Sequence, residues 1–311
     1  MTPTIRSFRP ADAEAATAAL RDGRPYLVTT PEAVAWQVVA QPHLRMLVAE
    51  TGGRIAGTAR YGAYPDSDSP GHGFARLHVV PGARGRGTGS ALLRAVEAEL
   101  AADGVRHLHC WADDEPAAHA FAAARGYTRG RVGYFARRDL AAPLPAVPAV
   151  PPGTALCTAA DFLDDPRPLY LVDVEGTQDE PGDVALADQA YDSWLAEIWQ
   201  RPDFDRTLTS VVVADGGPVA FSAAQTDGRG RYWSSFTTTR AAYRGRGLAR
   251  LAKADSLHRA RAAGFTEAFT HNDGGNAPML AVNAWLGYER CAAEWKYTRD
   301  LPGRPAPAGP A

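Results

Sequence analysis

Cysteine is scarce in this chain of 311 residues, and the three that occur, Cys110, Cys157 and Cys291, lie far apart. An odd number at such spacing matches neither a disulfide framework nor a zinc-binding pattern. Cys110 and Cys291 stand in apolar, strand-like runs, so we interpret them as small core residues rather than nucleophiles. The sequence therefore predicts neither a disulfide-stabilised scaffold nor a metal site.

Long apolar runs and a large charge of one sign are also missing. No stretch approaches the roughly 20 apolar residues that span a bilayer, and the N-terminal segment has no signal-peptide pattern. The formal net charge of -2 provides no general attraction for nucleic acid or an anionic membrane. We expect a cytoplasmic protein that binds no nucleic acid and no membrane.

Two stretches of the chain read alike. The tetrapeptide Arg-Gly-Arg-Gly occurs as Arg84–Gly87 and again, 160 residues later, as Arg244–Gly247. Downstream, Arg125-Gly126-Tyr127 recurs as Leu286-Gly287-Tyr288 after 161 residues. A motif that returns with its flanking strand and helix indicates a duplicated domain, and two such long copies are not a solenoid.

Proline marks the boundary between the copies. The segment AAPLPAVPAVPPG, residues 141–153, holds five prolines in thirteen residues, which favours an extended, semi-rigid connector. We predict a first domain over residues 1–140, a linker over 141–153, a second domain over 154–301 and a disordered tail over 302–311. Each copy shows antiparallel strand patterns followed by strand–helix–strand patterns. The predicted fold class is α/β (α+β), each domain being a mixed, mostly antiparallel sheet flanked by helices.

The repeated Arg-Gly-Arg-Gly lies between a predicted strand and a predicted helix in both copies. Glycines there allow consecutive backbone N–H groups to point inward, and the start of the helix adds unpaired donors and a positive dipole end. The arginines contribute charge and bidentate donors suited to phosphate. A glycine-rich turn with solvated arginines is the alternative, and its occurrence twice in one setting disfavours it.

Two common phosphate-binding patterns do not fit. A P-loop requires Gly-Lys followed by Ser or Thr, and the dinucleotide fingerprint requires GxGxxG, which neither copy has. The pattern Arg/Gln-x-x-Gly-x-Gly/Ala, by contrast, is complete as Arg84, Gly87, Gly89 and as Arg244, Gly247, Ala249. With its flanking elements it resembles the GNAT acetyltransferase superfamily over about residues 3–140 and 155–301. The chain looks like a tandem member with two fused GNAT domains.

The resemblance implies acetyl-CoA as the cofactor, held by the strand and loop of each copy and by two asparagines in the second. In the first copy the implied cofactor-binding residues are His78, Val79, Val80, Arg84, Gly85, Arg86, Gly87, Thr88 and Gly89. In the second copy they are Thr238, Thr239, Arg240, Arg244, Gly245, Arg246, Gly247, Leu248, Ala249, Asn272 and Asn276. The alternative interpretation of Asn272 and Asn276 is that both serve only to form a turn.

The catalytic positions depart from the family pattern. Where many members have a tyrosine that protonates the departing thiolate, this chain has Ala122 in the first copy and Asn283 in the second. An amide donates a hydrogen bond but no readily transferred proton. Because the first copy also has Glu115 where the second has Asn276, we place the active site in the second copy. Its predicted catalytic residues are Asn283, facing the thioester sulfur, and, as weaker candidates, Ser235 and His271.

Acceptor selection is expected from the segment 169–200, which is acidic and aromatic. Asp173 and Glu175, with Asp179, Glu180 and Asp183, would attract a cationic amine, and Trp194 or Trp199 would form a wall. A solvated helix and loop is the alternative. We expect an acetyl-CoA-dependent N-acetyltransferase acting on a small amine by direct attack on the thioester, as a monomer or weak homodimer. A non-catalytic CoA- or acyl-CoA-binding sensor or docking protein is the alternative. A role similar to mycothiol synthase remains a narrower option, on tandem architecture alone.

Overall fold

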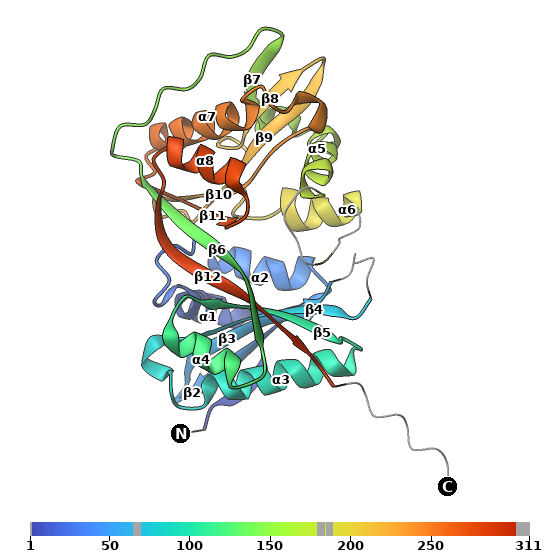
Figure 1. Ribbon diagram of the computed structural model, residues 1–311, viewed down its shortest axis with the longest axis vertical. Coiled ribbons are helices and arrows are strands. Elements are labelled where there is room, and N and C mark those ends of the chain that lie inside the picture. Colours follow the sequence, from blue (N-terminus) through green and yellow to red (C-terminus); the bar gives the residue numbers. More distant parts are fainter. Residues whose placement is uncertain (1, 65–69, 179–183, 185–188, 303–311) are drawn as a thin grey trace.

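The computed structural model describes residues 2–64, 70–178, 184 and 189–302. Two lobes lie one above the other, joined along one side by a pair of long strands (Figure 1). The first copy supplies β1 (Thr4–Ser7), α1 (Ala13–Arg21), α2 (Pro31–Ala40), β2 (Leu44–Thr51), β3 (Arg54–Ala63), β4 (His72–Val79), α3 (Thr88–Ala102), β5 (His107–Asp113), α4 (Pro116–Ala123) and β6 (Thr128–Asp139).

The second copy repeats this order element by element. It supplies β7 (Thr154–Thr158), α5 (Arg167–Thr177), α6 (Tyr191–Trp194), β8 (Ser210–Ala214), β9 (Gly217–Thr226), β10 (Arg231–Thr239), α7 (Leu248–Ala262), β11 (Glu267–Asp273), α8 (Ala277–Trp285) and β12 (Glu289–Asp300). A π-helical turn, Leu195–Trp199, continues α6. Residues 141–153 form neither helix nor strand, and His258 of α7 contacts the Pro145 carbonyl at 2.9 Å, so this segment lies against α7.

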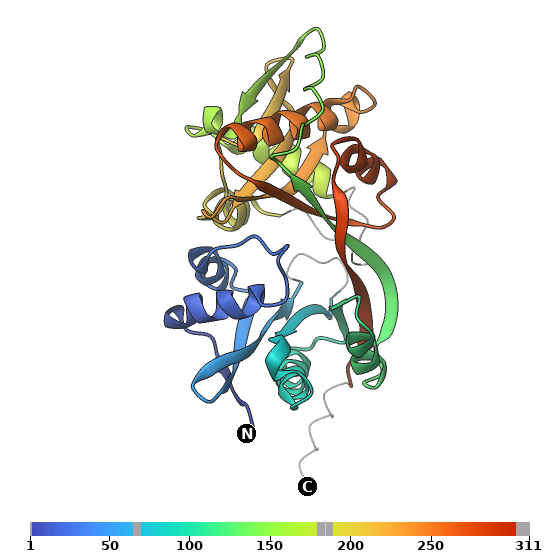
Figure 2. The same ribbon diagram turned by 90° about the vertical axis from the view of Figure 1, so that its left-hand side faces the viewer.

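The described strands form one continuous sheet in the order β1-β2-β3-β4-β5-β12-β6-β11-β10-β9-β8-β7. Only β4–β5 and β10–β11 pair in parallel among these strands, and the other pairs are antiparallel. In the first-copy lobe, helices lie on both sides of the sheet (Figure 2). The predicted fold class, a mixed and mostly antiparallel sheet flanked by helices, is confirmed.

The closing strands of the two copies are exchanged. Strand β6 of the first copy pairs with β11 of the second, and β12 of the second pairs with β5 of the first. The two exchanged strands also pair with each other and form the ribbon that crosses between the lobes (Figure 2). Each lobe therefore has its sheet completed by a strand from the other copy, which the sequence-based element order does not reveal.

The hydrophobic cores confirm that this exchange is structural rather than a surface contact. Tyr297 and Leu301, from the C-terminal end of the chain, are buried in the first-copy core with Leu92 and Leu108. In return, Ala136 and Leu140 of the first copy are buried among residues of α7 and β10 in the second-copy core. Both crossings bury apolar surface, which stabilises the two copies together.

The ends of the helices follow from ordinary capping rules. Thr30 accepts a hydrogen bond from the Ala33 amide at 3.0 Å at the start of α2, and Asn276 accepts one from the Met279 amide at 3.2 Å at the start of α8.

Within the described residues, every helix is too short or too polar to traverse a bilayer.

Candidate active site

Strands β10 and β11 begin as a parallel pair and then diverge. Their pairing runs from Arg231–Glu267 only to Ser234–Thr270, although β10 continues to Thr239 and β11 to Asp273. The backbone of the diverging segments has no partner strand across the opening, so its polar groups can bind a ligand laid between them. A cavity of about 650 Å³ occupies this opening.

The first copy has the same opening. Strands β4 and β5 pair in parallel from His72–His107 to Ala75–Cys110 and then separate. A cavity of about 490 Å³ lies there, and Tyr297 of the exchanged strand β12 contributes to its lining. Each repeat therefore contains a cleft between parallel strands next to its Arg-Gly-Arg-Gly loop.

Both loops have the backbone conformation that an anion cradle requires. Gly245 and Gly247 have φ of +76°, and Gly85 and Gly87 have φ of +73° and +85°. The long helix begins at the next residue in each copy, so the unpaired N–H groups of its first turn face the loop. A Cβ added at Gly245, Gly85 or Gly87 would meet no atom within 4 Å, which shows open space in front of the backbone.

Most of the predicted cofactor-binding residues line one of the two cavities. In the second copy these are Thr238, Thr239, Arg244, Gly245, Gly247, Leu248, Ala249, Asn272 and Asn276; in the first they are His78, Val79, Arg84, Gly85, Gly87 and Gly89. The others, Val80, Arg86, Thr88, Arg240 and Arg246, are not among the lining residues. Arg240 instead binds Glu175, and Thr88 is buried.

The two copies differ at one position close to the loop, which is Glu115 in the first copy and Asn276 in the second. The Nε of Arg84 and of Arg244 donates to a carbonyl of the preceding strand, at 3.2 Å and 3.1 Å. In the first copy the carboxylate of Glu115 also contacts Arg84, at 2.7 Å. The corresponding Asn276 of the second copy is uncharged and caps α8. A carboxylate at the first loop competes with a phosphate for the same guanidinium.

A second difference lies in the diverging strand itself. The register between β9 and β10 shifts at Ser234 and Phe236, leaving Ser235 as a bulged residue, whereas the pairing of β3 with β4 runs without a shift. A bulge turns one backbone amide out of the ladder. The Ser235 hydroxyl donates to the Ala223 carbonyl at 3.3 Å, and the residue lines the cavity.

His271 lines the second-copy cavity and is held by both exchanged strands. Its ring lies 4.5 Å from that of Phe135 on β6, and its Nε2 is 3.3 Å from Glu294 Oε1 on β12, an ion-pair distance without hydrogen-bond alignment. Burial lowers the pKa of His271, an effect that Glu294 opposes in part. The imidazole is therefore neutral at pH 7 and can accept a proton.

Glu294 is itself buried, with 1% of its surface exposed, and is paired on the other side with Arg76 of β4. Both carboxylate oxygens accept from Arg76, at 2.9 Å and 3.1 Å. Burial raises the pKa of Glu294, but Arg76, His271 and Arg24 outweigh it and hold that pKa below its usual value. The carboxylate is thus charged and connects the two copies. No sequence pattern marks it, because its partners come together only through the strand exchange.

Lys253 is a further cavity residue that the sequence did not single out. It lies on α7 with 1% of its surface exposed, and its Nζ is 3.3 Å from Thr270 Oγ1, at the last paired position of β11. Burial lowers the pKa of Lys253 to about 7. Leu93 holds the corresponding place in the first cavity. The one available signal was a lysine within the apolar face of a predicted helix.

Asn283 is placed differently from the expectation that it faces a thioester sulfur. Its side chain is 4% exposed and is not among the cavity-lining residues. Its Nδ2 donates to Asn272 Oδ1 at 2.6 Å, so it orients Asn272, which does line the cavity. A buried amide committed to a neighbouring amide is a positioning group rather than a sulfur contact.

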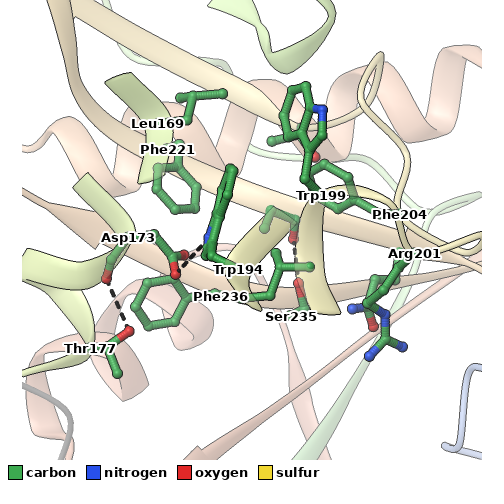
Figure 3. A pocket seen from close by; sticks show the side chains of 14 residues that line it. Leu169, Asp173, Thr177, Trp194, Trp199, Arg201, Phe204, Phe221, Ser235 and Phe236 are labelled. Carbon is green, nitrogen blue, oxygen red and sulfur yellow. Dashed lines mark hydrogen bonds between the residues drawn. The ribbon is translucent and has the colours of Figure 1, made fainter. Parts of the chain in front are cut away.

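A smaller cavity, of about 260 Å³, adjoins the second-copy cavity of about 650 Å³. Ser235 and Phe236 line both (Figure 3). The expected substrate residues Asp173 and Trp194 line the smaller cavity, and the Trp194 indole donates to Asp173 Oδ2 at 3.1 Å. Glu175 differs from expectation, because it accepts from Arg240 and the Ala241 amide. Residues 179, 180 and 183 lie outside the described part of the chain.

Comparison with known proteins decides the family. Residues 13–127 match the Acetyltransferase (GNAT) family. The chain is 33% identical over 256 residues to the mycothiol acetyltransferase of Kineococcus radiotolerans, covering 81% of this chain and 80% of that protein. It is 32% identical over 264 residues to that of Thermobispora bispora, covering 82% and 83%. The chain belongs to the GNAT acetyltransferase family.

Solved structures extend the match to the tandem arrangement. A tandem GNAT protein from the clavulanic acid biosynthesis pathway superposes with a TM-score of 0.71 and 21% identity, covering 97% of this chain and all of that one. A GCN5-related N-acetyltransferase from Sphaerobacter thermophilus gives 0.70 and 19%, covering 97% of both. At such identities the likeness concerns the fold. It confirms the expected tandem GNAT architecture, and family membership makes the chain an acyltransferase, as predicted.

GNAT acetyltransferases generally use acetyl-CoA as the acyl donor, and this GNAT chain has a cavity suited to it. The loop glycines with positive φ leave space where a Cβ would lie, and the helix start faces that space. Arg244 and the N–H groups of the loop suit a pyrophosphate, and the diverging strands suit an extended arm with amides. The described residues of the second-copy cavity thus fit the donor.

Proposed function

We propose that this chain transfers the acetyl group of acetyl-CoA to the amine of a small molecule, and that the second copy performs the reaction. One observation carries the proposal: the cavity of the cofactor loop adjoins a second, aromatic cavity, and Ser235 and Phe236 line both. A donor and an acceptor bound in adjoining cavities meet at this boundary, and such positioning supplies much of the rate of acyl transfer.

When bound, acetyl-CoA supplies the thioester that an amine attacks. Arg244, Gly245, Gly247 and the first turn of α7 would hold its pyrophosphate, and the diverging ends of β10 and β11 its arm. His271 is neutral and takes the proton that the amine loses, because Glu294 lies beside Nε2 and leaves Nδ1 as the acceptor. Lys253 Nζ, with a pKa of about 7, holds a proton that the departing sulfur can receive.

This assignment gives Lys253 the role that a tyrosine has in many members of the family. Neither Ala122 nor Asn283 carries a proton for the leaving group, whereas Lys253 is buried beside Thr270 where β10 and β11 separate. Asn283 and Asn272 then act as a pair that shapes the wall of the cavity. In the first copy, Leu93 and Ala122 hold the places of Lys253 and Asn283, so that copy has no counterpart of the Lys253 proton donor, and we assign turnover to the second copy.

A second feature of the first copy, besides Glu115, disfavours binding of the donor in its cavity. His78 is buried, its Nε2 lies 2.9 Å from the Asp22 carbonyl, and burial lowers the pKa of His78 to about 4. The ring is neutral and engaged with the segment after α1, which packs over the diverging end of β4. We propose that the first copy is a structural partner with weakened donor binding, in a chain that works as a monomer.

The experiment is a thiol-release assay of the full chain with acetyl-CoA and a panel of amines, run beside calorimetric titration with CoA. Amine-dependent release with tight CoA binding is expected. CoA binding without release for any amine would favour the alternative, a non-catalytic CoA-binding protein. The family names of the relatives add a mycothiol-type acceptor as a second candidate, which belongs in the same panel.

A further inference from the structure

The smaller cavity, of about 260 Å³, is lined largely by aromatic side chains and suits an apolar ligand. We propose that it selects a compact amine with an aromatic or otherwise apolar body, and that Asp173 receives the ammonium group. This inference rests on the proposed acetyl transfer in the second copy and names its acceptor class. It separates this chain from enzymes whose acceptors are polyhydroxylated sugars.

Aromatic rings form the walls of the cavity. The indoles of Trp194 and Trp199 stack with centroids 5.8 Å apart, and Phe204 lies 5.7 Å from Trp199. Phe221 and Phe236 form another pair at 5.9 Å. Apart from Phe236, these side chains are at most 9% exposed. Carbon rings offer few partners to hydroxyl groups, so a polyol would lose its hydration without replacement.

Asp173 is the carboxylate among the described residues that line the cavity. Asp173 is 8% exposed and accepts a hydrogen bond from Trp194, and a carboxylate has capacity for further donors. Among the described lining residues the one cation is Arg201, and both oxygens of Asp203 accept from it, at 2.9 Å each. Its charge is therefore already balanced. The cavity favours a simple cationic amine over an amino acid that carries its own carboxylate.

The position of Asp173 directs the amine toward the donor. Asp173 lies on α5 and lines the smaller cavity together with Phe236, which also lines the larger one (Figure 3). One turn later on the same helix, Gly176 lines the donor cavity, and a Cβ there would lie 2.2 Å from Thr238 Oγ1. Helix α5 thus touches both cavities, and a nitrogen drawn to Asp173 is held next to the diverging strands.

Size narrows the class further. A volume of about 260 Å³ equals roughly nine waters at about 30 Å³ each, which is the size of one ring with a short chain. 2-Phenylethylamine and tryptamine are therefore suitable probes, and glucosamine is a polyhydroxylated amine of comparable size. Comparable size matters because a preference between these probes then reports polarity rather than bulk.

The test measures kcat/KM of the full chain for these amines with saturating acetyl-CoA. We expect values about 100-fold higher for the aryl amines than for glucosamine. Calorimetry with 2-phenylethylamine provides a readout that needs no turnover, and we expect binding that Asp173→Asn weakens at least about tenfold. Asp192→Asn, at an exposed position of α6, is the matched control and should change neither quantity.

The outcomes separate this inference from the proposed function. A preference for glucosamine overturns the acceptor class and leaves the acetyltransferase proposal standing. Absence of any acetylation with CoA binding intact defeats the proposed function. In that case 2-phenylethylamine binding still tests the ligand class of the smaller cavity. Binding that is lost in Asp173→Asn supports this ligand class, and no binding to the natural chain overturns it. The amine panel requires no variant, so it decides the class even if Asp173→Asn fails to fold.

Discussion

Glu294 Oε1 lies 3.3 Å from His271 Nε2, and this relationship exists only because β12 leaves its own copy to complete the other. The same carboxylate binds Arg76 of the first copy. One buried side chain thus joins a candidate base in the second cavity to a cation of the first lobe. It also makes the acidity of His271 dependent on both copies.

Replacing Glu294 by Gln should move the acid limb of the pH–rate profile to lower pH. The negative charge of Glu294 raises the pKa of His271, so its removal lets the imidazole stay neutral at greater acidity. The pKa of Glu294 is lowered in the fold, so the stability it contributes is present above its ordinary pKa of 4.5 and is lost as pH falls. At pH 7 the variant should lose about 1–3 kcal/mol of unfolding free energy.

The matched control is Glu289→Gln, an exposed carboxylate on the same strand. Kinetics over a range of pH and chemical denaturation check both effects. An unchanged acid limb in Glu294→Gln would show that Glu294 is structural and that His271 is not the titrating base.

Lys253 should produce the alkaline limb of the same profile. A proton donor must be charged, so activity falls as pH rises through its pKa of about 7. Lys253→Met should lower kcat about 100-fold at pH 7 and remove this limb, while CoA affinity changes little. Because the folded pKa is below the ordinary 10.5, unfolding free energy should rise with pH between these values in the natural chain and stay flat in the variant.

Arg261→Met, an exposed change on the same helix, is the control for Lys253. If Lys253→Met keeps full kcat with an intact alkaline limb, the proton for the thiolate comes from elsewhere.

Gly247→Val should weaken CoA binding to the second copy at least about tenfold, because a β-branched residue at φ of +76° costs about 1–2 kcal/mol and its side chain enters the cradle. Isothermal calorimetry measures the effect. Gly87→Val is the equivalent change in the first copy and should leave the tighter site intact. Unaltered binding in Gly247→Val would place the pyrophosphate elsewhere.

Glu115 should account for weak donor binding in the first copy. Glu115→Gln frees Arg84 from its carboxylate and should tighten CoA binding at that site by about tenfold. The reciprocal change, Asn276→Asp, keeps an oxygen to cap α8 and adds a charge beside the second loop, where it should weaken binding. Two equal sites in the natural chain, seen by calorimetric stoichiometry, would contradict this account.

The strand exchange predicts that neither half of the chain folds by itself. Residues 1–140 lack Tyr297 and Leu301 from their core, and residues 154–311 lack Ala136 and Leu140 from theirs. Each half expressed alone should be insoluble or unfolded, and co-expression should restore a soluble complex that binds CoA. Size-exclusion chromatography and circular dichroism provide the readout. A stable folded monomer of either half would refute the dependence.

The sequence by itself determined the repeat, the two anion-binding loops and the order of elements, because these depend on local rules. Glycine at positive φ, proline in the linker and apolar periodicity act within a few residues, so Arg244–Gly247 could be assigned to a loop that precedes a helix. The missing tyrosine was equally visible as Ala122 and Asn283.

Only the tertiary structure decided which side chains meet. The sequence of β12 does not indicate whether this strand completes the sheet of its own copy or that of the other copy. The exchange brings Glu294 next to His271. The direction of the Asn283 amide and the burial of Lys253 likewise depend on neighbours distant in the chain. Local propensity sets the elements, whereas the burial of apolar surface across the exchanged strands sets their partners, and the candidate site lies among those partners.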